Sequence, residues 1–97
     1  MSQYRAGQIV DVPCDVQAGA FPSERLVTIE TVEGVMSGFI RSEYVRGEPG
    51  SRGSIRGKVA RVSGNIVEVE LLGSFFTSTG MAAVQASSLQ SIAEHRA

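Results

Sequence analysis

Residues 55–70 read Ile-Arg-Gly-Lys-Val-Ala-Arg-Val-Ser-Gly-Asn-Ile-Val-Glu-Val-Glu, and this stretch decides the fold class. In its second part, apolar and acidic side chains alternate from residue 67 to residue 70. Alternation with a period of two is typical of a β-strand that has one buried face. Ser63-Gly64-Asn65 separates this run from an earlier one at 55–62, so the stretch predicts a β-hairpin.

The same alternation occurs along the rest of the chain. It predicts further strands at 10–16, 26–32, 35–41 and 81–84. Pro13 lies inside the first of these runs and has no N–H to donate, so we expect that strand to be an edge strand or to carry a bulge. The sequence therefore predicts an all-β fold.

The C-terminus carries a different pattern. Leu89, Ile92, Ala93 and Arg96 follow the i, i+3, i+4, i+7 spacing of a helix face. We expect a short C-terminal helix at about 87–95.

The two halves of the chain show the same order of apolar positions. Residues 26–30 align with 66–70, and residues 38–45 align with 82–89. This order predicts an internal repeat of two β-units, at 7–46 and 53–90, joined by a glycine-rich connection at 47–52. Units of this size are too small to bury a stable core of their own, so we expect residues 1–97 to form a single compact domain. One continuous barrel of six to eight strands is the alternative.

Two segments carry a family resemblance. Gly-Phe-Ile-Arg-Ser-Glu-Tyr-Val at 38–45 resembles the last strand and 3-10 turn of SH3 domains, and residues 55–70 resemble the hairpin of KOW-type and other SH3-like barrels. The resemblance implies two packed SH3-like barrel units. Recognition of proline-rich peptides is not implied, because the acidic, aromatic-rich loop and its tryptophan are absent and Arg41 replaces the usual proline. Tyr44 remains as a candidate groove aromatic.

A second resemblance is fainter. Residues 5–10 and 21–25 resemble the start of SH3-like endoribonuclease toxins. The later Thr-Ser segment of those toxins, and a polar cluster suited to RNA cleavage, are not recognisable. An endoribonuclease toxin is therefore a minor alternative.

Composition limits the possible chemistry. The chain has 97 residues, 42% hydrophobic and 20% charged, which fits one globular domain. Its one cysteine, Cys14, alternates with valines and should face the core, and one histidine gives no metal-ligand spacing. We expect no enzyme activity, no metal and no cofactor. Without a signal-like or membrane-length apolar run, we expect a cytoplasmic protein without a membrane partner.

Charge is unevenly distributed. The net charge of the chain is −1, yet residues 41–61 hold six basic and two acidic side chains. Phosphate contact is the functional interpretation of this segment, with cross-strand pairing to glutamates as the alternative. The candidate nucleic-acid-binding residues are Arg41, Arg46, Arg52, Arg56 and Lys58.

An aromatic pair supplies the second candidate surface. Phe75 and Phe76 are adjacent, so only one of them can face the core from a strand, and Thr77 adds a hydroxyl group beside them. An exposed phenylalanine suits contact with a partner. The candidate partner-binding residues are Phe75, Phe76, Thr77 and Tyr44.

The leading hypothesis is a non-catalytic interaction module. It would bind a protein partner, or a second copy of itself as an oligomer, through an exposed aromatic or β-edge surface. The alternative is a nucleic-acid-binding protein that uses the basic residues of 41–61. The sequence leaves open the partner, the oligomeric state and whether a small ligand fits between the units.

Overall fold

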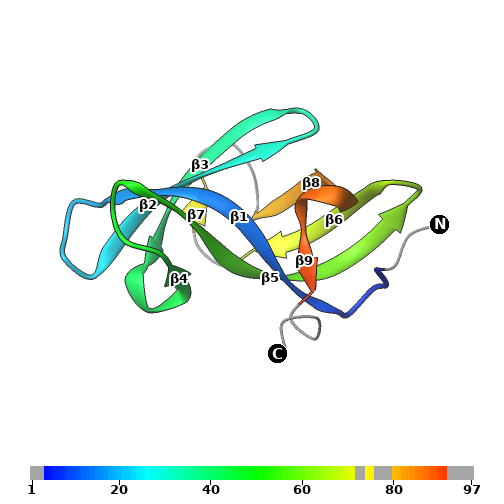
Figure 1. The fold of residues 1–97 in the computed structure, drawn as a ribbon, viewed down its shortest axis with the longest axis horizontal. Coiled ribbons are helices and arrows are strands. Elements are labelled where there is room, and N and C mark those ends of the chain that lie inside the picture. The colour runs from blue at the N-terminus through cyan, green and yellow to red at the C-terminus, as the bar shows by residue number, and fades with distance from the viewer. Residues whose placement is uncertain (1–3, 72–73, 76–79, 92–97) are drawn as a thin grey trace.

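The computed structural model describes residues 4–71, 74–75 and 80–91, which form one curled antiparallel sheet shaped as a half-barrel (Figure 1). The described strands are β1 (Ile9–Ala18), β2 (Glu24–Thr31), β3 (Gly34–Arg41), β4 (Val45–Arg46), β5 (Ser51–Ser63), β6 (Ile66–Leu71), β7 (Ser74–Phe75), β8 (Met81–Gln85) and β9 (Gln90–Ser91). Two 3-10 turns, η1 (Ser42–Tyr44) and η2 (Ala86–Ser88), precede β4 and β9. The predicted all-β fold is confirmed.

The two longest strands form the centre of the sheet. The strand order is β7-β3-β2-β1-β5-β6-β8, and β1 pairs with β5 over eight consecutive residue pairs, from Ile9↔Lys58 to Val16↔Ser51. Figure 1 shows β1 and β5 running side by side through the middle of the molecule. This central ladder joins the first half of the chain to the second.

The short strands cross between the halves. β4 belongs to the first half but pairs with β5, with Val45 opposite Ile55. β9 belongs to the second half but pairs with β1, with Gln90 opposite Asp11. The last described strand of each half therefore pairs with the first strand of the other half. The internal repeat and the SH3-like assignment stay predictions.

The core lies on one face of the curled sheet. Alternation in β1 places Val10, Val12, Cys14 and Val16 inside, each at most 1% exposed. The buried apolar side chains of both halves belong to one hydrophobic cluster. At one end of it, the buried Tyr4 hydroxyl donates a hydrogen bond to the Leu89 carbonyl at 3.1 Å. This bond ties the two ends of the described chain together.

The expectation that Pro13 lies in an edge strand is wrong. β1 is a central strand rather than an edge strand. Proline is nevertheless tolerated there for a clear reason. On the side of β1 away from β5, β9 pairs with residues 10–11 and β2 pairs with residues 15–18. Within the described ladders, Pro13 falls in the interval between these two partners, where a proline interrupts neither.

The expected C-terminal helix is not found in the described part of its range. Residues 86–88 form the 3-10 turn η2, and Gln90–Ser91 pair with β1 as β9. Residues 92–95 of the expected helix lie outside the described residues. The connection is also shorter than expected, because β5 already begins at Ser51.

Candidate binding site on the central ladder

The outward face of the central ladder carries polar and charged side chains. Since valines and Cys14 of β1 point into the core, the residues between them point outward. Residues directly opposite in a ladder share a face, so β5 contributes its own outward row. The opposed outward pairs are Ile9↔Lys58, Asp11↔Arg56, Pro13↔Ser54 and Asp15↔Arg52.

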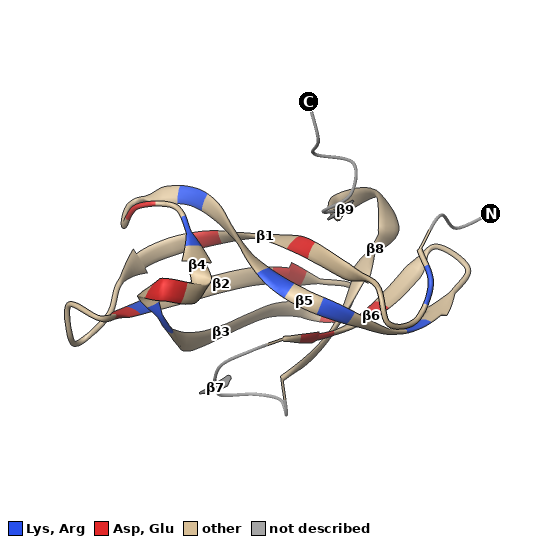
Figure 2. Cartoon of the chain, turned by 90° about the horizontal axis from the view of Figure 1, so that it is seen from below, with Lys and Arg blue, Asp and Glu red and all other residues tan. Residues whose placement is uncertain are grey.

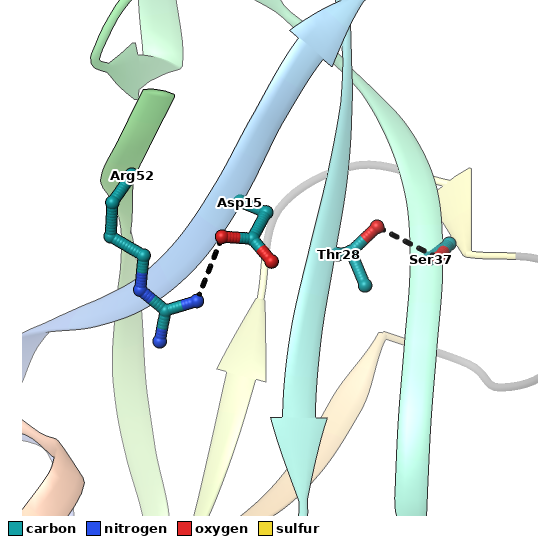
Figure 3. Close-up of polar contacts among 4 residues, drawn as sticks. All are labelled: Asp15, Thr28, Ser37 and Arg52. Atoms are coloured by element: carbon teal, nitrogen blue, oxygen red, sulfur yellow. Dashed lines mark hydrogen bonds and ion pairs between the residues drawn. The ribbon is translucent and has the colours of Figure 1, made fainter. Parts of the chain in front are cut away.

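A polar row crosses four strands at one end of this face. Arg52 Nη1 donates a hydrogen bond to Asp15 Oδ1 at 3.0 Å, and both side chains are more than half exposed. On the next two strands, the hydroxyl groups of Thr28 and Ser37 lie 3.1 Å apart (Figure 3). These groups satisfy one another, which makes the row a solvated surface with little unused binding capacity.

A hollow of about 260 Å³ lies further along the same face. It is lined by Asp11 of β1, Glu43 and Tyr44 of η1, Arg46 of β4, and Ser54 and Arg56 of β5. We call it the η1 hollow. It exists because β4 crosses to β5 and brings η1 to the central ladder. Tyr44 is 46% exposed, so its ring forms part of the open wall.

Asp11 is the unusual residue of the η1 hollow. It is only 4% exposed, and its Oδ1 atom has no hydrogen-bond partner among the described residues. The other oxygen, Oδ2, lies 3.9 Å from Arg46 Nη1, which is within ion-pair range but beyond hydrogen-bond distance. A buried carboxylate with unused acceptor capacity is energetically costly. Such a group is therefore a candidate for contact with a ligand.

A second hollow, of about 520 Å³, adjoins the first. It is lined by Ile9, Arg56, Gly57, Lys58, Glu70 and Leu71. We call it the Ile9 hollow, because Ile9 is 45% exposed on the outward face there. Arg56 lines both hollows. The two hollows therefore lie beside each other along β1 and β5, and Arg56 forms part of the wall of both.

Most basic residues of the 41–61 segment have acidic partners. Arg41 donates to Glu43 at 3.2 Å, Arg52 to Asp15 at 3.0 Å, and Arg61 Nε to Glu68 at 3.1 Å. Arg46 lies near Asp11 as described above. Figure 2 shows the basic bands on β5 beside acidic bands on β1. Within the described residues, Arg56 and Lys58 form no ion pair.

No family model, curated protein or solved structure matches this chain.

The structure places the predicted site residues unequally. The two hollows are lined in part by Tyr44, Arg46, Arg56 and Lys58. From the sequence, Tyr44 is a candidate for partner binding and the three basic residues are candidates for nucleic-acid binding. Arg41 and Arg52 line neither hollow. The backbone of Phe75 pairs with Gly38 through β7. The side chain of Phe75, and all of Phe76 and Thr77, lie outside what the structure describes.

Sequence reasoning did not single out Asp11 as a functional residue. In the sequence it is one of two aspartates that alternate with valines, and nothing distinguishes it from Asp15. Asp15 is exposed, whereas Asp11 is buried where η1 and β4 reach the ladder. An acidic residue in a central strand could have marked Asp11 as unusual. The strand order is needed to know that β1 is central, and the sequence does not supply it.

The remaining reactive groups are unremarkable. Burial raises the pKa of the Cys14 thiol to about 11, which keeps it protonated and unreactive at neutral pH. In residues 4–71, 74–75 and 80–91, no three His, Cys, Asp or Glu side chains gather as metal ligands. In the same residues, no helix is both long enough and apolar enough to cross a membrane.

Proposed function

We propose that this chain is a non-catalytic module that binds an extended segment of a partner protein along the two hollows of the central ladder. One observation carries the proposal. Arg56 lines both hollows and has no carboxylate partner among the described residues, while Arg41, Arg46, Arg52 and Arg61 each have one. A cation left unpaired between two hollows suits a partner that supplies the missing acceptor.

The Ile9 hollow indicates the chemistry of that partner. Two cations, Arg56 and Lys58, face it together with one carboxylate, Glu70, so its lining carries a net charge of +1. Ile9 and Leu71 supply apolar surface beside these charges. An extended segment that presents an apolar side chain and, two residues away on the same face, a carboxylate would complement both features.

A catalytic role has less support. In the described part of the chain, no Ser, Thr or Cys side chain donates a hydrogen bond to a carboxylate or an imidazole. The nucleophile and base of most covalent enzymes show that contact. A cytoplasmic location belongs to the same proposal, because the single cysteine is a buried free thiol.

Nucleic-acid binding is the competing function. It would rest on the same basic segment, but four of its six cations already lie near carboxylates. Affinity for phosphates requires free cations and falls steeply with salt. The ion pairs therefore favour the protein partner.

The first test is a binding screen with defined probes. A positional-scanning library of N-acetylated, C-amidated octapeptides is screened against the chain, beside single-stranded hexanucleotides. We expect selection of an Ile, Leu or Phe together with an Asp or Glu two residues away, on the same face of the extended peptide. Binding of the oligonucleotides alone, lost between about 50 and 500 mM salt, would support the nucleic-acid function and contradict our proposal.

Matched variants locate the binding surface. Lys58→Gln removes a cation of the Ile9 hollow, and Arg61→Gln removes a cation of the same strand that pairs with Glu68 outside both hollows. We expect Lys58→Gln to weaken the selected peptide roughly 10-fold and Arg61→Gln to leave it nearly unchanged. Equal effects of the two variants would show that binding occurs elsewhere.

Light scattering after size exclusion separates self-association from partner binding. A stable oligomer at both salt concentrations, whose formation is abolished by Ile9→Ser, would identify a second copy as the occupant. A monomer that binds the selected peptide supports the proposal as stated.

A further inference from the structure

Asp11 and Arg56 are directly opposite in the central ladder, yet they do not pair. The register places Asp11 of β1 against Arg56 of β5 on the outward face. Opposite charges at such positions attract each other and can stabilise the sheet. Here no ion pair joins them, Asp11 Oδ1 has no partner among the described residues, and both residues line the η1 hollow.

The two side chains leave complementary capacities unused. The carboxylate of Asp11 can accept a hydrogen bond at Oδ1, and the guanidinium of Arg56 can donate several. A group that enters the η1 hollow can satisfy both only if it carries a donor and an acceptor. The hollow is large enough, at about 260 Å³, for a side chain of moderate size.

The charges of the lining select a neutral group. Asp11 and Glu43 contribute two negative charges, and Arg46 and Arg56 contribute two positive charges, so the sum is zero. A carboxylate would be attracted by the two arginines but would face the buried Asp11, and a cation would be attracted by the two acids but would face two guanidinium groups. A carboxamide offers an NH₂ donor and a C=O acceptor without net charge.

We propose that the η1 hollow is a recognition pocket for a carboxamide side chain, Gln or Asn, of the partner segment. The NH₂ group would donate to Asp11 Oδ1, and the carbonyl oxygen would accept from Arg56. The exposed ring of Tyr44 would cover the aliphatic stem. This inference rests on the proposed function and specifies it further.

The spacing of the two hollows fixes the position of the carboxamide. Asp11 and Ile9 are two residues apart on the same face of β1, which separates them by about 7 Å. An extended partner segment has the same repeat, so side chains at i and i+2 would fill the two hollows. The motif is a carboxamide two residues away from the apolar residue.

The test uses three peptides that differ only at the position two residues from the apolar anchor, on the side away from the acidic residue. The selected octapeptide is made with Gln, Glu or Met there, and affinities are measured by isothermal titration calorimetry. We expect the wild-type chain to bind the Gln peptide at least about 10-fold more tightly than the other two. Equal affinity for the three would overturn the inference.

Variants of Asp11 and Arg56 then test whether these residues set the preference for the Gln peptide. A purely structural role would weaken all three peptides alike and would not change the preference. Asp11→Asn turns the acceptor into a group that also donates, so we expect the preference to shift from the Gln peptide to the Glu peptide. Asp15→Asn, the exposed aspartate of the same strand, should leave the preference unchanged. Arg56→Lys serves as a second variant and should weaken the preference for Gln, because it loses the planar fork of donors.

The outcomes separate this inference from the function on which it rests. A library that selects apolar and acidic residues but shows no carboxamide preference overturns the pocket and leaves the module standing. A library that selects nothing overturns both. Displacement of the Gln peptide by free guanosine, without displacement by N-acetylglutamine amide, would assign the η1 hollow to a nucleobase and overturn the inference.

Discussion

Asp11 of β1 and Arg56 of β5 lie directly opposite each other in the central ladder and form no ion pair. The carboxylate is buried, and Oδ1 has no hydrogen-bond partner in the described part of the chain. The fold therefore holds a polar group in a costly environment at the point where the two halves meet. Destabilised groups of this kind are commonly found where a protein binds its ligand.

The first prediction concerns the stability of the unliganded chain. Asp11→Asn keeps the shape of the side chain but removes a buried charge whose Oδ1 has no hydrogen-bond partner among the described residues. We expect the free energy of unfolding in urea to rise by about 1 kcal/mol, since the loss of the 3.9 Å contact with Arg46 offsets only part of the relief.

Asp15→Asn is the matched control for this measurement. Asp15 is exposed and pairs with the exposed Arg52, so we expect a change within about 0.5 kcal/mol. If Asp11→Asn instead lowers the stability by 1 kcal/mol or more, Asp11 is a structural ion-pair partner of Arg46, and the pocket loses its main support.

The second prediction concerns pH. Burial raises the pKa of the Cys14 thiol from 9.0 to about 11. Below pH 9 the thiol is protonated in both the folded and the unfolded chain, so it adds no pH dependence. Between about pH 9 and pH 11 the unfolded chain releases the proton while the folded chain keeps it, and stability falls as the pH rises.

Urea unfolding of the wild type and of Cys14→Ala isolates this contribution. The wild type should lose about 2 kcal/mol relative to the variant when the pH is raised from about 8 to about 10.5. A difference between the two proteins that does not change with pH would show that the thiolate is tolerated in the folded state.

The third prediction concerns Gly53, which lies in β5 beside the residues that pair with β4. A Cβ atom at this position would lie 2.0 Å from the Arg46 carbonyl oxygen and 3.0 Å from Val16 Cγ2. Backbone atoms of β4 cannot move aside cheaply. We expect Gly53→Ala to destabilise the fold by about 2 kcal/mol or to displace β4, which would also weaken peptide binding in the η1 hollow.

Gly64→Asn is the control for Gly53→Ala. Gly64 has a φ of +60° and open space around it, and asparagine tolerates that backbone conformation. It should cost less than about 1 kcal/mol and leave peptide binding intact. A Gly53→Ala protein with normal stability and normal affinity would mean that β4 adapts to the added methyl group.

The strands could be predicted from the sequence because their cause is local. Alternation between core and solvent marks β1, β2, β3, β5, β6 and β8, and each predicted run overlaps the observed strand. The glycine between β5 and β6 likewise marks its hairpin turn, since a φ of +60° favours glycine.

The pairing of the strands could not be predicted in this way. Whether β4 pairs with β1 or with β5 depends on contacts between residues far apart in the chain, and both choices preserve the alternation. The burial of Asp11 follows from that choice. At the C-terminus, the helical spacing around Leu89 is outweighed by tertiary contacts, because Leu89 is buried and accepts the Tyr4 hydrogen bond while β9 pairs with β1.

The fourth prediction follows from the central ladder. A fragment of residues 1–50 contains β4 but lacks its partner β5, and a fragment of residues 51–97 contains β9 but lacks its partner β1. Their buried side chains also belong to one cluster. We expect each fragment alone to be unfolded by circular dichroism and amide exchange, and an equimolar mixture to recover the native spectrum. A folded 1–50 fragment that gives sharp, dispersed NMR signals without the second half would contradict a shared core and support two independent units.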